Sequence, residues 1–113
     1  MFGCVLRVCG VKLEQDESLS VLRRFADGAN IEVTSVDLDW ADMVLEATRF
    51  LESRANELQS MVASDGFESA ELDFGVPQQN KPEVSYIFPA KIARLSGSLG
   101  ISLRVSTYAV DDT

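Results

Sequence analysis

Three aspartates stand close together in the middle of the chain, at Asp37, Asp39 and Asp42. Closely spaced carboxylate oxygens suit Ca²⁺ or Mg²⁺, so these residues are candidates for a metal site or for carboxylate-based catalysis. A calcium loop would need further ligands and a glycine turn, which are absent here. The simpler interpretation is a helix start, at which Asp39 caps the first turn and Asp42 interacts with the helix dipole.

A second acidic group alternates along a candidate strand, where Glu71 and Asp73 share one face. Arg7 and Arg104 occupy the corresponding faces of two other candidate strands. If these strands are neighbours, the charges form cross-strand ion pairs. The alternative is a polar sheet face that binds a partner, with Glu71 and Asp73 in contact with it.

Aromatic residues supply the remaining candidates for recognition. Trp40 is the single tryptophan, and it could anchor a protein partner or pack over one end of the core. Tyr86 and Phe88 precede Pro89, where they could contact a ligand or staple the chain onto the following helix.

Several kinds of chemistry are excluded because the chain contains no histidine. Ser-His-Asp and Cys-His catalysis are therefore absent, and no phosphate loop or dinucleotide fingerprint is present. Cys4 and Cys9 are five strand positions apart, on opposite faces and roughly 16 Å from each other, too far for a disulfide. We predict no catalytic residue and no cofactor, and two reduced, structural thiols.

The net charge of −8 argues against nucleic-acid binding, which requires basic surface. It suits a soluble protein or one whose partner is basic. No window approaches the roughly 20 apolar residues of a membrane span, and no signal peptide is evident, so we expect no membrane contact and a cytoplasmic location.

The 113 residues suit a single domain, 1–113, with a frayed tail at 109–113. Period-two alternation predicts strands at 2–9, 31–36, 67–74 and from 101 towards 108. A bulge or strand end is expected near Thr34 and Ser35, where the alternation slips. Helical spacing predicts helices at 17–26, from Asp39 to a stop at 64–66, and from Pro89 to a stop at Gly97 or Gly100. Residues 75–84 read as a mobile loop.

The expected order is therefore β-α-β-α-β-α-β. Because the strands alternate, one sheet face should be wet and the helices should cover the other. This predicts an α/β (α+β) two-layer sandwich with a four-stranded mixed sheet, most simply a ferredoxin-like variant.

The segments CVLRVCG, IEVTSVD, RFLESRANEL, ELDFGV and YIFPAKIARLSGSLGISLRVSTY span nearly the whole chain. In order and spacing they resemble the bacterial domain-of-unknown-function family 4279 or a close branch of it. The resemblance implies an α/β domain from a bacterium and carries over no activity.

Two functional hypotheses follow. The first is a non-enzymatic protein-binding module, such as an acidic immunity-type inhibitor of a basic toxin, with Trp40, Glu71, Asp73 and Tyr86 as candidate contacts. The second is a small-ligand or metal-binding protein or enzyme that uses Asp37, Asp39 and Asp42. A homodimer is also possible, through an exposed strand face or edge that carries Val5 and Cys9.

Overall fold

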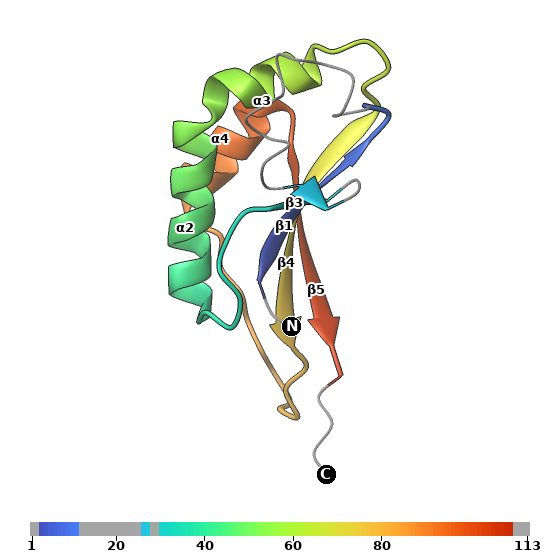
Figure 1. Ribbon diagram of the computed structural model, residues 1–113. Helices are drawn as coiled ribbons and strands as arrows, with labels where there is room; N and C mark the ends of the chain where they lie inside the picture. The colour runs from blue at the N-terminus through green and yellow to red at the C-terminus, as the bar shows by residue number, and fades with distance from the viewer. Residues whose placement is uncertain (1–2, 12–25, 28–29, 110–113) are drawn as a thin grey trace.

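The structure, a computed structural model, describes residues 3–11, 26–27 and 30–109. It has two layers, a mixed β-sheet and a layer of helices that covers one face of that sheet (Figure 1). The described strands are β1 (Cys4–Cys9), β2 (Ala26–Asp27), β3 (Asn30–Glu32), β4 (Ser69–Pro77) and β5 (Ser102–Tyr108); the described helices are α2 (Trp40–Ser53), α3 (Ala55–Val62) and α4 (Ala90–Leu99). The α+β class and the mixed sheet are thereby confirmed.

The sheet order is β2-β3-β1-β4-β5. Strand β1 pairs antiparallel with both β3 and β4, whereas β4 and β5 are parallel. The four predicted strands are all present, and the two-residue β2 extends the sheet. Because the order of helices and strands differs from the expected one, the ferredoxin-like variant is not confirmed. The predicted helix at 17–26 lies outside the described residues except for Ala26, which belongs to β2.

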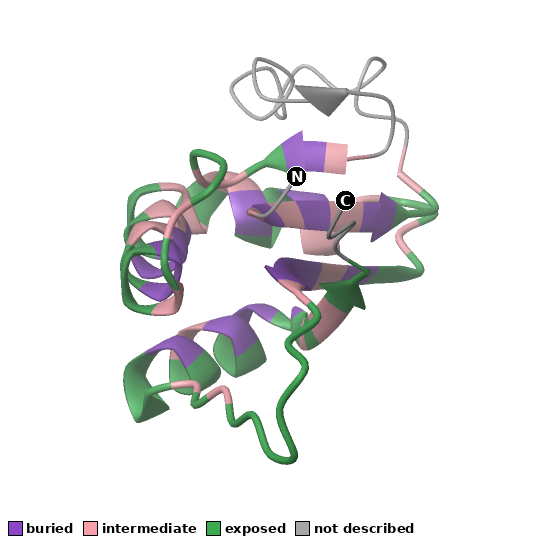
Figure 2. Cartoon of the chain, turned by 90° about the horizontal axis from the view of Figure 1, so that it is seen from below, coloured by how far each residue is buried: buried purple, intermediate pink, exposed green. Residues whose placement is uncertain are grey.

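The alternation along the strands placed the apolar side chains correctly. Leu6 in β1 and Leu72 and Phe74 in β4 are fully buried beneath the helices, and purple bands mark the buried positions on both layers in Figure 2. Among the described residues, the core contains Cys4, Leu6, Val8, Ile31, Met43, Val44, Ala47, Leu51, Leu58, Met61, Ala70, Leu72, Phe74, Val76, Ile92, Leu99 and Ile101.

The strand predicted at 31–36 ends earlier, at Glu32. The amides of Val33 and Thr34 both donate to the Cys4 carbonyl, at 3.1 and 3.3 Å, so the regular ladder stops there. The Thr34 hydroxyl then accepts the Cys4 amide at 3.0 Å. The predicted slip in phase near Thr34 and Ser35 is therefore a strand end.

The long helix predicted after Asp39 is two helices that meet at Arg54, whose φ of −114° and ψ of 20° are not helical. Just before the break, the Ser53 hydroxyl donates to the Phe50 carbonyl at 3.4 Å, a side-chain contact that competes with the helical ladder and bends helices. Leu51 on α2 and Leu58 on α3 are both fully buried, so the apolar stripe continues across the bend.

Strand β4 extends to Pro77, so the first three residues of the predicted loop 75–84 are strand. A proline can occupy position 77 because of the direction in which the backbone groups of β4 point. Two residues earlier, the Gly75 amide points towards β1 and donates to the Gly3 carbonyl at 2.8 Å. By alternation the Pro77 nitrogen also points to the β1 side, away from the pairing with β5, so no ladder bond is lost. The predicted start of α4 after Pro89 and its end at Gly100, with φ of 78°, are confirmed.

Candidate functional site

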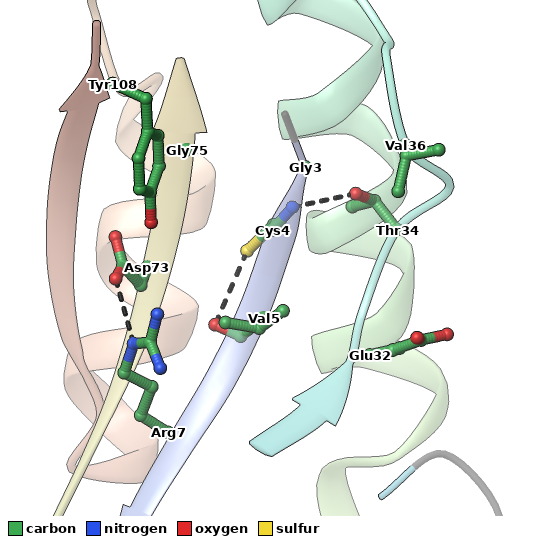
Figure 3. Close-up of a pocket in the computed structure, with 10 residues that line it drawn as sticks. All are labelled: Gly3, Cys4, Val5, Arg7, Glu32, Thr34, Val36, Asp73, Gly75 and Tyr108. Atoms are coloured by element: carbon green, nitrogen blue, oxygen red, sulfur yellow. Dashed lines mark hydrogen bonds and ion pairs between the residues drawn. The ribbon is translucent and has the colours of Figure 1, made fainter. Parts of the chain in front are cut away.

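The sheet face opposite the helices contains a hollow of about 230 Å³. It lies over β1 and β4, between Tyr108 at the end of β5 and the chain that leaves β3 (Figure 3). Its lining consists of Gly3, Cys4, Val5, Arg7, Glu32, Thr34, Val36, Asp73, Gly75 and Tyr108. We call this the open-face hollow.

Arg7 and Asp73 form the charged floor of the open-face hollow. The antiparallel register sets Val5 opposite Asp73 and Arg7 opposite Glu71, so the Arg7 side chain reaches one pair diagonally along the face. The Arg7 Nε donates to an Asp73 oxygen at 2.9 Å, and its Nη1 donates to the Asn30 Oδ1 at 3.1 Å. Both groups belong to one hydrogen-bonded network.

Asp73 is only 5% exposed, whereas Arg7 is 40% exposed. The second Asp73 oxygen accepts the Ser106 hydroxyl from β5 at 2.6 Å. The hydrogen bond with Asp73 raises the pKa of the Arg7 guanidinium, against a smaller lowering by burial. Asp73 is therefore a buried anion with partners on both oxygens, and Arg7 is the group of this pair that a bound molecule can reach.

Glycine on the open face makes room for Tyr108. A Cβ atom at Gly75 would lie 3.0 Å from the Tyr108 Cε2, so the ring rests directly against the β4 backbone. Tyr108 remains 43% exposed, and Val36 on the opposite rim is 51% exposed. The open-face hollow thus has a charged floor and two apolar rims.

The predicted cross-strand ion pairs are confirmed, because β4 lies between β1 and β5. Besides Arg7 and Asp73, Arg104 pairs with Glu71 at 2.9 Å. Glu71 and Asp73 lie on the same sheet face, as the alternation predicted. The two carboxylates differ in burial, because the Glu71 side chain is more exposed to solvent than the Asp73 side chain.

The aspartates at 37, 39 and 42 lie at the start of α2 and in the chain just before it. Asp39 is the N-cap of α2, and its carboxylate accepts the Asp42 amide at 2.8 Å. Asp37 has a positive φ of 60° in the turn before it. Among residues 3–11, 26–27 and 30–109, no group of three or more Cys, Asp or Glu side chains could hold a metal ion. The contact between Asp39 and the Asp42 amide agrees with the capping interpretation.

Trp40 and Tyr86 lie together, on the helix side of the sheet. The Trp40 ring is 4.9 Å from the Tyr86 ring, 5.1 Å from that of Phe88 and 5.4 Å from that of Phe74, between centroids. Its Nε1 donates to the Ile87 carbonyl at 2.9 Å. Tyr86 and Phe88 therefore pack against Trp40 at the start of α2, and the predicted staple onto α4 stays a prediction. A second hollow, of about 240 Å³, adjoins this cluster.

The sequence reasoning did not single out Gly75 and Tyr108, which line the open-face hollow, or Asn30 and Ser106, which form hydrogen bonds with its charged floor. The alternation of β5 places Ser106 and Tyr108 on the same face as Arg104, because all three are even-numbered. Asn30 and Gly75 carried no such signal, because Asn30 precedes the strand predicted from residue 31 and Gly75 was assigned to the predicted loop 75–84.

Both thiols are free. Cys4 is buried, and burial raises the pKa of its thiol, with a smaller contribution from the Asp73 charge. Cys9 is exposed at the end of β1. Strand β1 pairs with β4 along its whole length and with β3 from Val5 to Arg7, so its edge at Val5 is already occupied. Self-association through the open face of β1 stays a prediction.

No family model matches the chain, and no curated protein or solved structure is significantly similar to it. The resemblance to family 4279 therefore stays a prediction. Within the described residues, no helix is long and apolar enough to cross a membrane.

Proposed function

We propose that the chain is a non-enzymatic protein-binding module whose binding surface is the open-face hollow together with the acidic segment beside it. The observation that carries the proposal is the composition of residues 32–46. This segment contains Glu32, Asp37, Asp39, Asp42 and Glu46 and no lysine or arginine. It leaves the sheet at the rim of the open-face hollow, next to the exposed Val36.

A binding role fits the hollow better than a catalytic one. Asp73, its buried carboxylate, already accepts hydrogen bonds from Arg7 and Ser106. A general base needs a free oxygen within reach of the proton that it removes. By contrast, exposed aromatic and aliphatic side chains beside charged groups are typical of protein recognition surfaces.

The partner that fits is a basic protein. Carboxylates along 32–46 would attract it over a distance of about one Debye length, roughly 8–10 Å, and speed its association. Tyr108 and Val36 would contact the apolar stems of its lysine or arginine side chains. An inhibitor that neutralises a basic toxin, as an immunity protein does, is one role of this kind. A bacterial origin, membership of family 4279 and a cytoplasmic location belong to the same proposal, and the two unpaired thiols suit a reducing compartment.

A pair of charge-matched variants tests this proposal. The rim variant carries Glu32→Gln, Asp37→Asn and Asp42→Asn and keeps the Asp39 cap. The control variant carries Asp65→Asn, Glu68→Gln and Glu83→Gln, three exposed positions outside the segment. Both change the net charge from −8 to −5, so any difference between them comes from the place of the charges.

Each protein is immobilised and exposed to a lysate of its source cells, and a recovered partner is then purified and titrated against all three by calorimetry. We expect the partner to be basic, to bind wild type and control alike, and to lose at least tenfold in affinity for the rim variant. Equal binding by the two variants, or recovery of no stable partner, would exclude the proposed surface.

A further inference from the structure

Strand β5 forms one margin of the sheet, and within the described part of the chain no strand pairs with its outer side (Figure 1). The Gln78 amide donates to the Tyr108 carbonyl at 2.7 Å, so Tyr108 directs its backbone groups towards β4. Backbone groups alternate in direction along a strand. The outward N–H and C=O groups of β5 are therefore those of Leu103, Val105 and Thr107.

This margin lacks the features that normally prevent strands from pairing with one another. Natural edge strands are commonly protected by proline, lysine, bulges or short length. Strand β5 has seven residues, SLRVSTY, without proline, lysine or glycine. Its single charge, Arg104, lies on the open face and is paired with Glu71 at 2.9 Å.

We propose that β5 pairs antiparallel with β5 of a second copy, about a two-fold axis at Val105, so that the two sheets become one. Val105 then faces its own copy, and Leu103 faces Thr107 of the partner. These residues have outward backbone groups, so the two residues of each facing pair form two N–H···O=C hydrogen bonds with each other. Both copies therefore contribute the same edge to the interface, as a two-fold dimer requires.

The side chains are compatible with the same register. On the helix side, Leu103 and Val105 are partly buried hydrophobic residues at the margin of the core, and pairing would bury them further. On the open face, Arg104 would face Ser106 and Tyr108 would face Ser102. No two like charges stand directly opposite each other, an arrangement that would oppose pairing.

The self-association differs from the proposed binding of a basic partner in its dependence on salt. Two copies each carry a net charge of −8, so their repulsion is screened as the ionic strength rises. We therefore expect the dimer to tighten with salt, whereas binding of a basic protein to the acidic segment should weaken. Neither proposal depends on the other.

Sedimentation equilibrium and light scattering of the purified chain, over a wide concentration range, measure the oligomeric state. Thr107→Pro removes an outward N–H at an exposed position and leaves the pairing with β4 intact. A symmetric dimer loses two hydrogen bonds, so we expect its dissociation constant to rise about 10- to 100-fold. Thr107→Val keeps the N–H and is the matched control, expected to dimerise as wild type does.

Hydrogen exchange of the wild type tests the register without any variant. The amides of Leu103, Val105 and Thr107 should become protected as concentration rises, while those of Arg104 and Ser106, which face β4, should be protected at all concentrations. A wild-type chain that stays monomeric up to near-millimolar concentration overturns the proposal. So does a dimer in which the three outward amides exchange freely, whether or not the proline variant folds.

Discussion

Replacing Asp73 by alanine removes the buried anion on which three strands converge. The carboxylate of Asp73 in β4 accepts Arg7 from β1 at 2.9 Å and Ser106 from β5 at 2.6 Å. Hydrogen bonds to a charged group contribute about 1.5–3 kcal/mol each. Because Arg7 is 40% exposed, its guanidinium regains water in the variant, and this reduces the loss. We therefore expect Asp73→Ala to lower the free energy of unfolding by about 2–3 kcal/mol.

Glu71 provides a matched control in the same strand and on the same face. Its pair with Arg104 has the same 2.9 Å separation, but the two side chains are 28% and 57% exposed. Exposed pairs of this kind contribute about 0–1 kcal/mol. Glu71→Ala should therefore cost clearly less than Asp73→Ala, although each variant removes one carboxylate and one ion pair.

Urea unfolding followed by circular dichroism gives both free energies, with equal m-values as a check that the unfolding reaction is unchanged. The double variant Arg7→Ala and Asp73→Ala completes a thermodynamic cycle, for which we expect a coupling energy of about 1 kcal/mol or more. If Asp73→Ala costs no more than Glu71→Ala, burial does not set the strength of the Arg7–Asp73 pair, and the reasoning is wrong.

Three further predictions concern other parts of the molecule. Trp40→Phe keeps an aromatic ring but removes the hydrogen bond to the Ile87 carbonyl, so the amides of residues 78–89 should exchange faster while those of β1 stay unchanged; equal rates in wild type and variant would show that this bond does not hold the segment. Gly97→Ala, at a helical position where an added Cβ meets nothing within 4 Å, should stabilise the protein by about 0.5–1 kcal/mol in urea unfolding; a loss of stability would contradict the open space there. In a thiol-reagent assay the exposed Cys9 should react at once and the buried Cys4, with its raised pKa, only on unfolding, so rapid reaction of both in the folded protein would be the contrary result. Since the folded Cys4 thiol holds its proton more tightly than the unfolded one, its stabilising contribution is fully present below the unfolded pKa of about 8.5 and is lost as the pH rises above it.

The faces of the strands and the ends of the helices could be predicted because they depend on residues close in sequence. Alternation placed Leu6 and Leu72 in the core, and Asp39 and Gly100 mark the start of α2 and the end of α4. Local signals were misleading where tertiary pairing overrode them. Gly75 and Pro77 are typical of a loop, yet both lie in β4 because β5 provides a partner for that length of chain.

The candidate site was predicted only in part. The sequence identified Arg7, Glu71, Asp73 and Arg104 as charges on wet strand faces, and it left open whether they meet. Asn30 and Ser106 could not be identified as partners of that network, because polar residues in strands are common and their neighbours are set by register. For the same reason Trp40 and Tyr86 were named separately, although their rings are in contact.

The sequence by itself determined which residues of each element are buried, since a period of two or of 3.6 residues is a property of a short stretch of chain. Only the tertiary structure decided the sheet order, which places β1 inside and β5 at the margin. It also decided that Arg7 meets Asp73, 66 positions away. Such contacts depend on which strands pair, and that choice results from packing the whole core at once rather than from any local preference.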